Sequence, residues 1–337
     1  MKPILRQPIL ALAVLAAAGL GACQAQSANI VQQIPGPDGS WDYASFDAAH
    51  HRVLISRSFG VEALDLASGK LTQVAPGARV HGSFALPDGR LLITNGATDT
   101  VTIANAATGA IEAAIPVGKN PDAAAFDPAS GAVMVMNAHS GDISVIDLAQ
   151  GKEAARIPVG GALEFAAADG AGMLFVNIED KAEIAAVDTK ARQVKAHFKL
   201  AGCEEPSGLA YVAPYRLLIS SCANGHAKVV SADDGHEVAD LAIGPHPDAV
   251  LYDQARGLAF IPSAGSLTAN GAITVIKVAS STSVTLAGKI DTTRGARTIA
   301  EDPATGRLYL PTADYGLGAD GKPHAKDGTF RVLVVAP

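Results

Sequence analysis

A segment of about 42 residues repeats seven times along this chain, and the repeat limits the possible fold more than any other feature. Each copy holds a polar residue, an apolar run and further short apolar runs separated by turns. The residue equivalent to Asp127 marks each copy, with spacings of 39, 41, 42, 43, 41 and 49 residues. The seven markers are Asp47, Leu86, Asp127, Asp169, Val212, Asp253 and Asp302.

Four short strands in each copy predict an all-β fold, a seven-bladed β-propeller with four-stranded antiparallel blades. One such sheet cannot bury both of its faces alone, so neighbouring copies must stack. The period and the density of turns are typical of radial propellers. The competing interpretations are an unclosed stack and a helical repeat. The apolar runs are too short and too often broken by turns for helices.

The two ends of the repeat predict how the ring closes. The last copy has strands near 297–301, 307–311 and 330–335, which is one strand fewer than the other copies have. The segment NIVQQI at 29–34 precedes the first copy. We predict that this segment supplies the outer strand of the last blade, because sharing one blade between both ends removes two free sheet edges.

The first residues have the pattern of an export signal. Lys2 and Arg6 precede an apolar stretch from about residue 9 to residue 20, and small residues follow. The sequence LGAC at 20–23 resembles a bacterial lipobox, which would make Cys23 the lipidated first residue of the mature protein. Cleavage near Ala25, which would leave a soluble periplasmic protein, is the alternative.

We therefore predict a signal peptide at 1–22, a short linker at 23–28 and one propeller domain at 29–337. The expected location is the periplasm, with a lipid anchor in the outer membrane. Gln24 after the cysteine favours that membrane by analogy with lipoproteins.

The mature chain is acidic. Without its first 22 residues it keeps 24 basic and 33 acidic residues, a net charge of −9. This balance argues against nucleic-acid binding, which needs a basic face. Cys203 and Cys222 remain after Cys23, and we predict a local disulfide between them because exported proteins tolerate such bonds. A redox or metal-binding pair is the alternative, but the spacing is not CxxC.

Several segments resemble the YVTN, or YncE-like, β-propeller family of exported bacterial proteins. They are FDPASGAVMVMNAHSGDISVIDLAQGK, NIEDKAEIAAVD, CEEPSGLA, RGARTIAEDPATGRLYLPTADYG and TFRVLVVAP. The strand motif that names the family occurs only in degraded form, as LLITN at 91–95 and MVMNA at 134–138. The resemblance implies a seven-bladed propeller and little about activity.

The first polar residue of each innermost strand lies five residues before each marker. Innermost strands line the central channel of a propeller, so we predict that these seven side chains surround one channel mouth and bind a ligand there. Trp41 could stack on that ligand or pack between blades. Alternatively, the polar residues only cap strand starts by bonding nearby backbone groups. The seven are Asp42, His81, Asp122, Glu164, Ser207, Asp248 and Arg297.

The acidic part of this ring is a candidate metal site. Clustered carboxylates raise one another's pKa, and Arg297 or a hard cation would offset that effect. Asp122, Glu164, Asp248 and His81 are the candidate ligands for one divalent cation, calcium or zinc. The sequence contains no GxSxG, HExxH, CxxCH or Walker motif.

These features predict a monomeric, non-enzymatic propeller that binds a small ligand or an envelope protein at its acidic channel mouth. Contact with the membrane is expected only through the lipid anchor. The alternative is a metal-dependent lactonase-type hydrolase that uses a cation in the channel. A third hypothesis is an electron-transfer accessory protein with haem or quinone at His81 or His246. The insertion at 312–328 is expected to be mobile or to cover one face.

Overall fold

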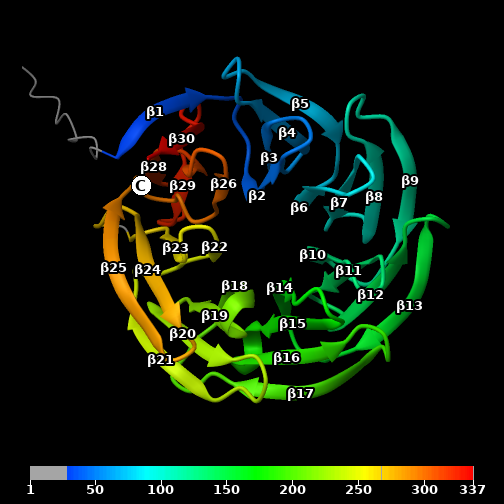
Figure 1. The fold of residues 1–337 in the computed structure, drawn as a ribbon. Helices are drawn as coiled ribbons and strands as arrows, with labels where there is room; N and C mark the ends of the chain where they lie inside the picture. The colour runs from blue at the N-terminus through cyan, green and yellow to red at the C-terminus, as the bar shows by residue number, and fades with distance from the viewer. Residues whose placement is uncertain (1–28, 267, 337) are drawn as a thin grey trace, which may run out of the picture.

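The computed structural model describes residues 29–266 and 268–336, which form a closed ring of seven four-stranded antiparallel sheets (Figure 1). The innermost strands surround the centre and the fourth strands form the rim. The predicted seven-bladed propeller is therefore confirmed. The predicted signal peptide, the linker and Cys23 lie outside the described residues. Within the described part, no helix is long and apolar enough to span a membrane.

The first four blades follow the chain, and each runs from the centre to the rim. Blade one contains β2 (Trp41–Asp47), β3 (Arg52–Arg57), β4 (Gly60–Asp65) and β5 (Leu71–Pro76). Blade two contains β6 (Val80–Ala85), β7 (Arg90–Asn95), β8 (Thr100–Asn105) and β9 (Ile111–Pro116). Blade three contains β10 (Pro121–Asp127), β11 (Ala132–Asn137), β12 (Asp142–Asp147) and β13 (Lys152–Pro158). Blade four contains β14 (Leu163–Ala168), β15 (Met173–Ile178), β16 (Glu183–Asp188) and β17 (Gln193–Lys199).

The last three blades include the ring closure, a small hairpin and two short 3₁₀ helices. Blade five contains β18 (Pro206–Val212), β19 (Leu217–Cys222), β20 (His226–Ser231) and β21 (Glu237–Ala242). Blade six contains β22 (Leu251–Asp253), β23 (Leu258–Ser263), β24 (Ala272–Ser280) and β25 (Ser283–Asp291). Blade seven contains β26 (Ala300–Asp302), β27 (Arg307–Thr312), β30 (Arg331–Val335) and β1 (Ile30–Pro35). The additional elements are β28 (Tyr315–Leu317), β29 (Pro323–Ala325), η1 (Glu179–Lys181) and η2 (Ala213–Tyr215).

The ring closes as the sequence predicts. Strand β1 pairs antiparallel with β30, so that Ile34 faces Val332 and Gln33 faces Leu333. Both ends of the described chain thus lie in one sheet, as Figure 1 shows. The N-terminal strand β1 fills the rim position of blade seven. The edge of β30 that would otherwise be free is thus paired with β1.

The hydrophobic core is divided among the contacts between blades. Among the described residues, buried apolar side chains form seven clusters, one between each pair of neighbouring blades. Middle strands such as β11 are buried along nearly their whole length because both of their faces contact other blades. Outer strands such as β13 alternate between exposed and less exposed residues. This difference explains the continuous apolar runs and the polar stretches of each repeat.

Most repeat markers end an innermost strand and shape the turn that follows it. Asp127 is fully buried, and its carboxylate accepts hydrogen bonds from the Ala129 amide at 3.1 Å and the Ser130 hydroxyl at 2.7 Å. Asp302 makes the equivalent bonds in blade seven. An Asp side chain that mimics a backbone turn accounts for this part of the repeat without any chemical role.

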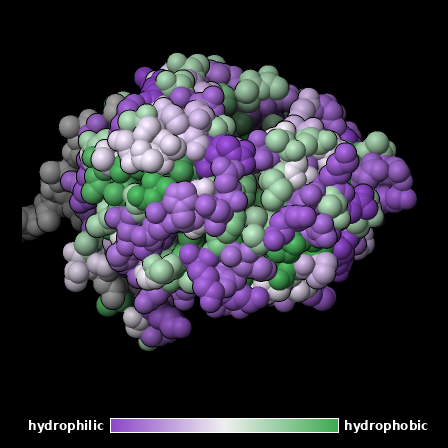
Figure 2. Space-filling model, turned by 60° about the horizontal axis from the view of Figure 1, so that its bottom comes forward, coloured by the Kyte–Doolittle hydropathy of each residue, from purple (hydrophilic) through white to green (hydrophobic). Residues whose placement is uncertain are grey.

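On the face of the molecule shown in Figure 2, hydrophilic residues are mixed with apolar areas. The large apolar residues that are exposed lie on different elements, namely Val31, Ile111, Leu286 and Leu317. Isolated exposed apolar residues are normal on a soluble domain.

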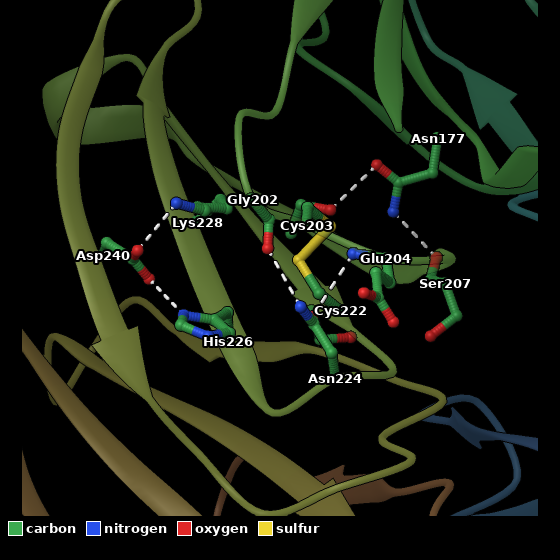
Figure 3. Close-up of a disulfide and its surroundings, with 12 residues drawn as sticks. Asn177, Gly202, Cys203, Glu204, Ser207, Cys222, Asn224, His226, Lys228 and Asp240 are labelled. Carbon is green, nitrogen blue, oxygen red and sulfur yellow. Dashed lines mark hydrogen bonds and ion pairs between the residues drawn. A yellow bond between two sulfur atoms is a disulfide. The ribbon is translucent and has the colours of Figure 1, made fainter. Parts of the chain in front are cut away.

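The predicted disulfide between Cys203 and Cys222 is present, with 5.4 Å between the two Cα atoms (Figure 3). It ties the loop before β18 to the end of β19. Hydrogen bonds from Asn224 to the Gly202 carbonyl and from the Glu204 amide to Asn224 hold the same loop. The bond is therefore a local staple at the start of an innermost strand.

Replacing Cys203 and Cys222 together by serine should lower the free energy of unfolding by about 2–4 kcal/mol, because the open chain gains conformational freedom. Chemical denaturation of the purified protein measures the change. A reductant should destabilise the wild type to a similar extent and leave the double variant unchanged. Equal stability of all three samples would contradict the staple role.

Candidate functional site

A β-bulge in the innermost strand accompanies the ring residues. Asp42, His81, Asp122, Glu164 and Ser207 are each the second residue of their strand. In each strand the pairing contains one extra residue at this point; in β10, for example, Pro121 pairs with Asn137 but Ala124 pairs with Val135. A bulge bends the strand and redirects side chains. The repeat therefore encodes a local distortion as well as a polar residue.

The two remaining ring residues precede their strands. Strand β22 begins at Leu251 and β26 begins at Ala300, so Asp248 and Arg297 lie in the connecting segments. The strand expected from residue 297 thus starts three residues later than the sequence predicts. In blade six, Pro247 forms an isolated bridge with Ser263 ahead of β22. Pro121 and Pro206 occupy the equivalent position in longer strands, so we have no physical account for the later start in either blade.

Three polar contacts link ring residues from neighbouring blades. The Nδ1 atom of His81 lies 2.7 Å from Asp42 and 3.8 Å from Asp122. Arg297 Nε lies 3.1 Å from an oxygen of Asp248. The side chains of Asp42, Asp122 and Asp248 are only 21%, 13% and 17% exposed. The acidic side chains are therefore largely desolvated, but solvent still reaches them.

Ser207 and Arg79 modify the ring that the sequence predicts. The Ser207 hydroxyl is buried and donates a hydrogen bond to the Pro247 carbonyl at 2.9 Å, so it serves the contact between two blades. Arg79 lies outside the predicted ring position, yet its Nε donates to Nε2 of His81 at 3.1 Å. Both imidazole nitrogens of His81 thus have protein partners.

Tyr43 crosses the centre of the ring beneath the carboxylates. It starts in blade one, and its ring lies 5.1 Å from that of Phe165 in blade four. The Tyr43 hydroxyl donates to Glu164 at 3.3 Å, and the side chain packs in the cluster that contains Ala123 and Leu163. The ring position therefore has a closed aromatic floor.

A signal for this floor lies in the sequence, although the repeat alone did not predict it. The residue after each ring position is small in five copies: Gly82, Ala123, Gly208, Ala249 and Thr298. Only Tyr43 and Phe165 are large there. At Gly208, a Cβ atom would lie 2.4 Å from the backbone of Ala249, so neighbouring strands approach too closely for a larger residue.

Burial and mutual repulsion disturb the pKa values of the ring carboxyls. Desolvation, together with the other carboxylates, raises the pKa of Asp122 to about 7 and that of Glu164 to about 10. Burial raises the pKa of Asp248 to about 6, although Arg297 opposes the rise. Burial lowers the pKa of His81, but the hydrogen bond to Asp42 and nearby negative charges outweigh it and raise the value.

Not all of the predicted metal ligands lie together. Oxygen and nitrogen atoms of Asp42, His81 and Asp122 lie within 4.8 Å of one another. Glu164 and Asp248 do not join this group among the described residues. The donor set fits a cation only in part, because His81 is already bonded to Asp42 and to the cationic Arg79.

A cavity of about 930 Å³ lies beside the ring, between the loops of blades one, six and seven. Arg297 lines both the ring and the cavity, and His246 lies on the cavity wall. Trp41 also lines it and packs against Phe330, with 5.2 Å between ring centroids. The predicted insertion at 312–328 forms one wall through β28, β29 and the residues after them.

Comparison with solved structures supports the fold. No family description matches the chain, and no curated protein does either. A chain in the crystal structure of a mitotic checkpoint complex aligns with a TM-score of 0.73 and 14% identity, over 97% of this chain and all of that one. A chain of hydrazine synthase from Kuenenia stuttgartiensis aligns with a TM-score of 0.68 and 14% identity, over 92% of this chain and 99% of that one. At this identity the likeness concerns the β-propeller fold alone.

The raised pKa of Asp122 gives the protein an unusual pH dependence. An unfolded Asp releases its proton near pH 3.8, whereas folded Asp122 keeps it to about pH 7. Between these values the folded state binds more protons, so this contribution to stability is present at low pH and is lost as the pH rises through that window. Asp122→Asn should stabilise the protein above pH 7 by on the order of 1 kcal/mol or more.

Thermal unfolding of wild type and Asp122→Asn across that pH range tests this prediction. The difference between the two proteins should grow as the pH rises. Asp291→Asn, which changes an exposed carboxylate in blade six whose partner is Lys289, is the control and should show no such trend. A variant less stable than wild type above pH 7 would contradict the argument.

Proposed function

We propose that this protein is a non-enzymatic binding module that holds the positively charged group of a small ligand at its acidic channel mouth. The carrying observation is the ring itself. Burial is the main cause that raises the pKa of the Tyr43 hydroxyl, and the nearby carboxylates of Glu164, Asp248, Asp122 and Asp42 each raise it further. Residues whose charge is disturbed by burial and by one another often mark a functional site.

A positively charged group would relieve the repulsion that the fold leaves in place. Arg297 pairs with Asp248, and Arg79 contacts His81 rather than a carboxylate. Glu164 is therefore the least compensated acid, whereas His81 and Arg79 partly offset the charge of Asp122. An ammonium group offers three donors to such oxygens. Carboxyl groups that hold their protons without a ligand would release them to the solvent when the ammonium group binds.

A small ligand agrees better with the surface than a broad protein interface does. The exposed large apolar residues Val31, Ile111, Leu286 and Leu317 lie on separate elements, and Figure 2 shows apolar areas interrupted by polar ones. Larger contiguous patches usually mark protein interfaces. The mouth, by contrast, combines partly buried charges with an adjoining cavity, as ligand sites do.

We also infer the family and the location from the sequence. The motifs quoted above support membership of the YVTN, or YncE-like, family. The N-terminal pattern supports export to the periplasm, and LGAC supports lipid attachment at Cys23 in the outer membrane. With these inferences the mouth would lie in the cell envelope, where both small ligands and envelope proteins are accessible to it.

The diamine putrescine is a suitable probe for the cationic site. It should bind the purified wild-type protein in a calorimetric titration and raise its melting temperature. Asp122→Asn and Glu164→Gln should be more stable than wild type without the diamine, yet should bind it at least about tenfold more weakly. A variant that is more stable than wild type but binds putrescine more weakly would identify the replaced residue as part of the binding site. Loss of a structural residue would instead lower the stability.

Asp291→Asn is again the matched control, because it removes one exposed acid and should bind as the wild type does. Equal affinity in Asp122→Asn and wild type would contradict a role for the ring. Absence of putrescine binding to the wild type would overturn the proposal.

A metal-dependent hydrolase is the second candidate, favoured by the close grouping of Asp42, His81 and Asp122. A divalent cation held there would polarise the carbonyl of a lactone. The contacts of His81 with Arg79 and Asp42 argue against it, since one of them would have to break. We therefore rank this candidate below the binding module.

Elemental mass spectrometry of the protein after dialysis against metal-free buffer distinguishes the two candidates. The binding module predicts no stoichiometric calcium or zinc. One equivalent of metal that is lost in Asp122→Asn, together with lactone hydrolysis by the wild type, would establish the hydrolase instead. Arg79→Gln removes the competing cation and should raise any metal affinity.

A further inference from the structure

The cavity beside the ring differs chemically from the ring. The ring has four carboxylates, whereas the cavity of about 930 Å³ has three aromatic residues and three long cationic residues in its lining. Its volume lies within the range of sites for drug-sized molecules. The lining residues that matter here are Trp41, Tyr315, Phe330, Arg294, Arg297 and Lys326.

The aromatic residues form a continuous wall. Trp41 packs on Phe330 with 5.2 Å between centroids and meets the edge of Tyr315 at 6.5 Å. Phe330 is almost fully buried, so it supports the wall from behind, while Trp41 and Tyr315 are half-buried and line the space. Aromatic rings arranged in this way present a large apolar surface with little conformational freedom to lose on binding.

The guanidinium groups gather near Tyr315. Arg294 lies over the Tyr315 ring at 5.5 Å. Burial raises the pKa of Tyr315, and the positive charges of Arg297 and Arg294 oppose that rise. Arg297 has Asp248 as its partner, but no carboxylate among the described residues lies within ion-pair distance of Arg294. One guanidinium in the cavity is thus left for an anion.

The carboxylates of the cavity lie elsewhere along its wall. Asp38 accepts a hydrogen bond from the Gly328 amide at 2.7 Å, and Asp327 is the residue before that glycine. Neither carboxylate lies within ion-pair distance of Arg294 or Arg297, so the charge beside Tyr315 comes from these two guanidinium groups. We call the part of the cavity beside Arg294 and Tyr315 its cationic end.

The loop that carries the arginines is fixed in place. Gly295 has a φ of +82°, and a Cβ atom there would lie 2.3 Å from the Tyr315 ring, so only glycine allows this close packing. The Gly295 amide donates to the Ala264 carbonyl at 2.8 Å, and Thr312 donates to the Arg294 carbonyl at 2.8 Å. The backbone on either side of the cationic end is therefore held before any ligand arrives.

We propose that this cavity binds an organic carboxylate with a planar apolar body, whose carboxylate pairs with Arg294 and whose body lies against Trp41 and Tyr315. A planar guanidinium matches a carboxylate with two parallel hydrogen bonds. The aromatic wall supplies the surface for the apolar part. This site uses residues other than the ring carboxylates, so it goes beyond the cation site proposed above.

A direct test is possible because Trp41, the only tryptophan of the chain, lines the cavity. The tryptophan fluorescence of the protein therefore reports on this cavity. Para-nitrobenzoate, a planar carboxylate that quenches tryptophan, should quench the purified protein with saturation. Para-nitrobenzyl alcohol has the same body without the charge and should bind about tenfold more weakly. That ratio corresponds to about 1.4 kcal/mol for the charged contact.

Three variants sharpen the test. Arg294→Gln should weaken para-nitrobenzoate at least about tenfold and leave the alcohol nearly unchanged. Arg294→Lys keeps the charge but loses the planar fork, so it should fall between Gln and wild type. Arg192→Gln is the matched control, because Arg192 lines a second cavity of about 660 Å³ at the opposite ends of the innermost strands.

Several results would overturn the proposal. They are linear quenching without saturation, equal affinity for the nitrobenzoate and the alcohol, or unchanged affinity in Arg294→Gln. Thermal unfolding confirms that each variant is folded, and if Arg294→Gln is not, the ratio between the two probes in wild type decides alone. Putrescine binding that persists in Arg294→Gln would show that the cation site in the ring does not depend on the anion site in the cavity.

Discussion

The pairing of β1 with β30 is the constraint on which the rest of this structure depends. It brings residues about 300 positions apart into one sheet, with Ile34 opposite Val332. A second link near the centre, from the Thr298 hydroxyl to the Asp42 carbonyl at 2.9 Å, joins blade seven to blade one. The seven innermost strands converge only when the ring is closed. These contacts therefore bring the polar residues of the mouth next to one another.

Closure brings the acidic side chains together, and the local backbone determines how they sit. A bulge at the second residue of five innermost strands redirects the ring side chains. Small residues such as Gly208 then let neighbouring strands approach. Tyr43 and Phe165 fill the space that the small residues leave. The carboxylates are thus held close together over an apolar floor, where their charges are costly, and a fold under no demand for function would be more stable without them.

The sequence revealed what is periodic and missed what is not. The spacing of markers such as Asp127 predicted the blades, the shared last blade and the ring, because every copy repeats the same strand and turn. The disulfide was predicted from two cysteines and from the export-signal pattern of the first residues. The contact of Tyr43 with Glu164 could not be predicted in this way, since it joins residues of different copies across the ring. Arg79 was missed because it lies two residues before His81, outside the repeated polar position. The cavity beside the ring depends on an insertion that breaks the repeat.

Arg297 stands between two regions of opposite character, and its position links them. It pairs with Asp248 of the ring and also lines the aromatic cavity. Its charge is what opposes the rise in the pKa of Asp248. An anion in the cavity that drew Arg297 away would leave Asp248 less compensated, and the ring would then hold a cation more strongly. Such coupling is reciprocal by thermodynamic necessity, so a cation in the ring would free Arg297 for the anion. A ligand that carried both charges would satisfy both regions at once.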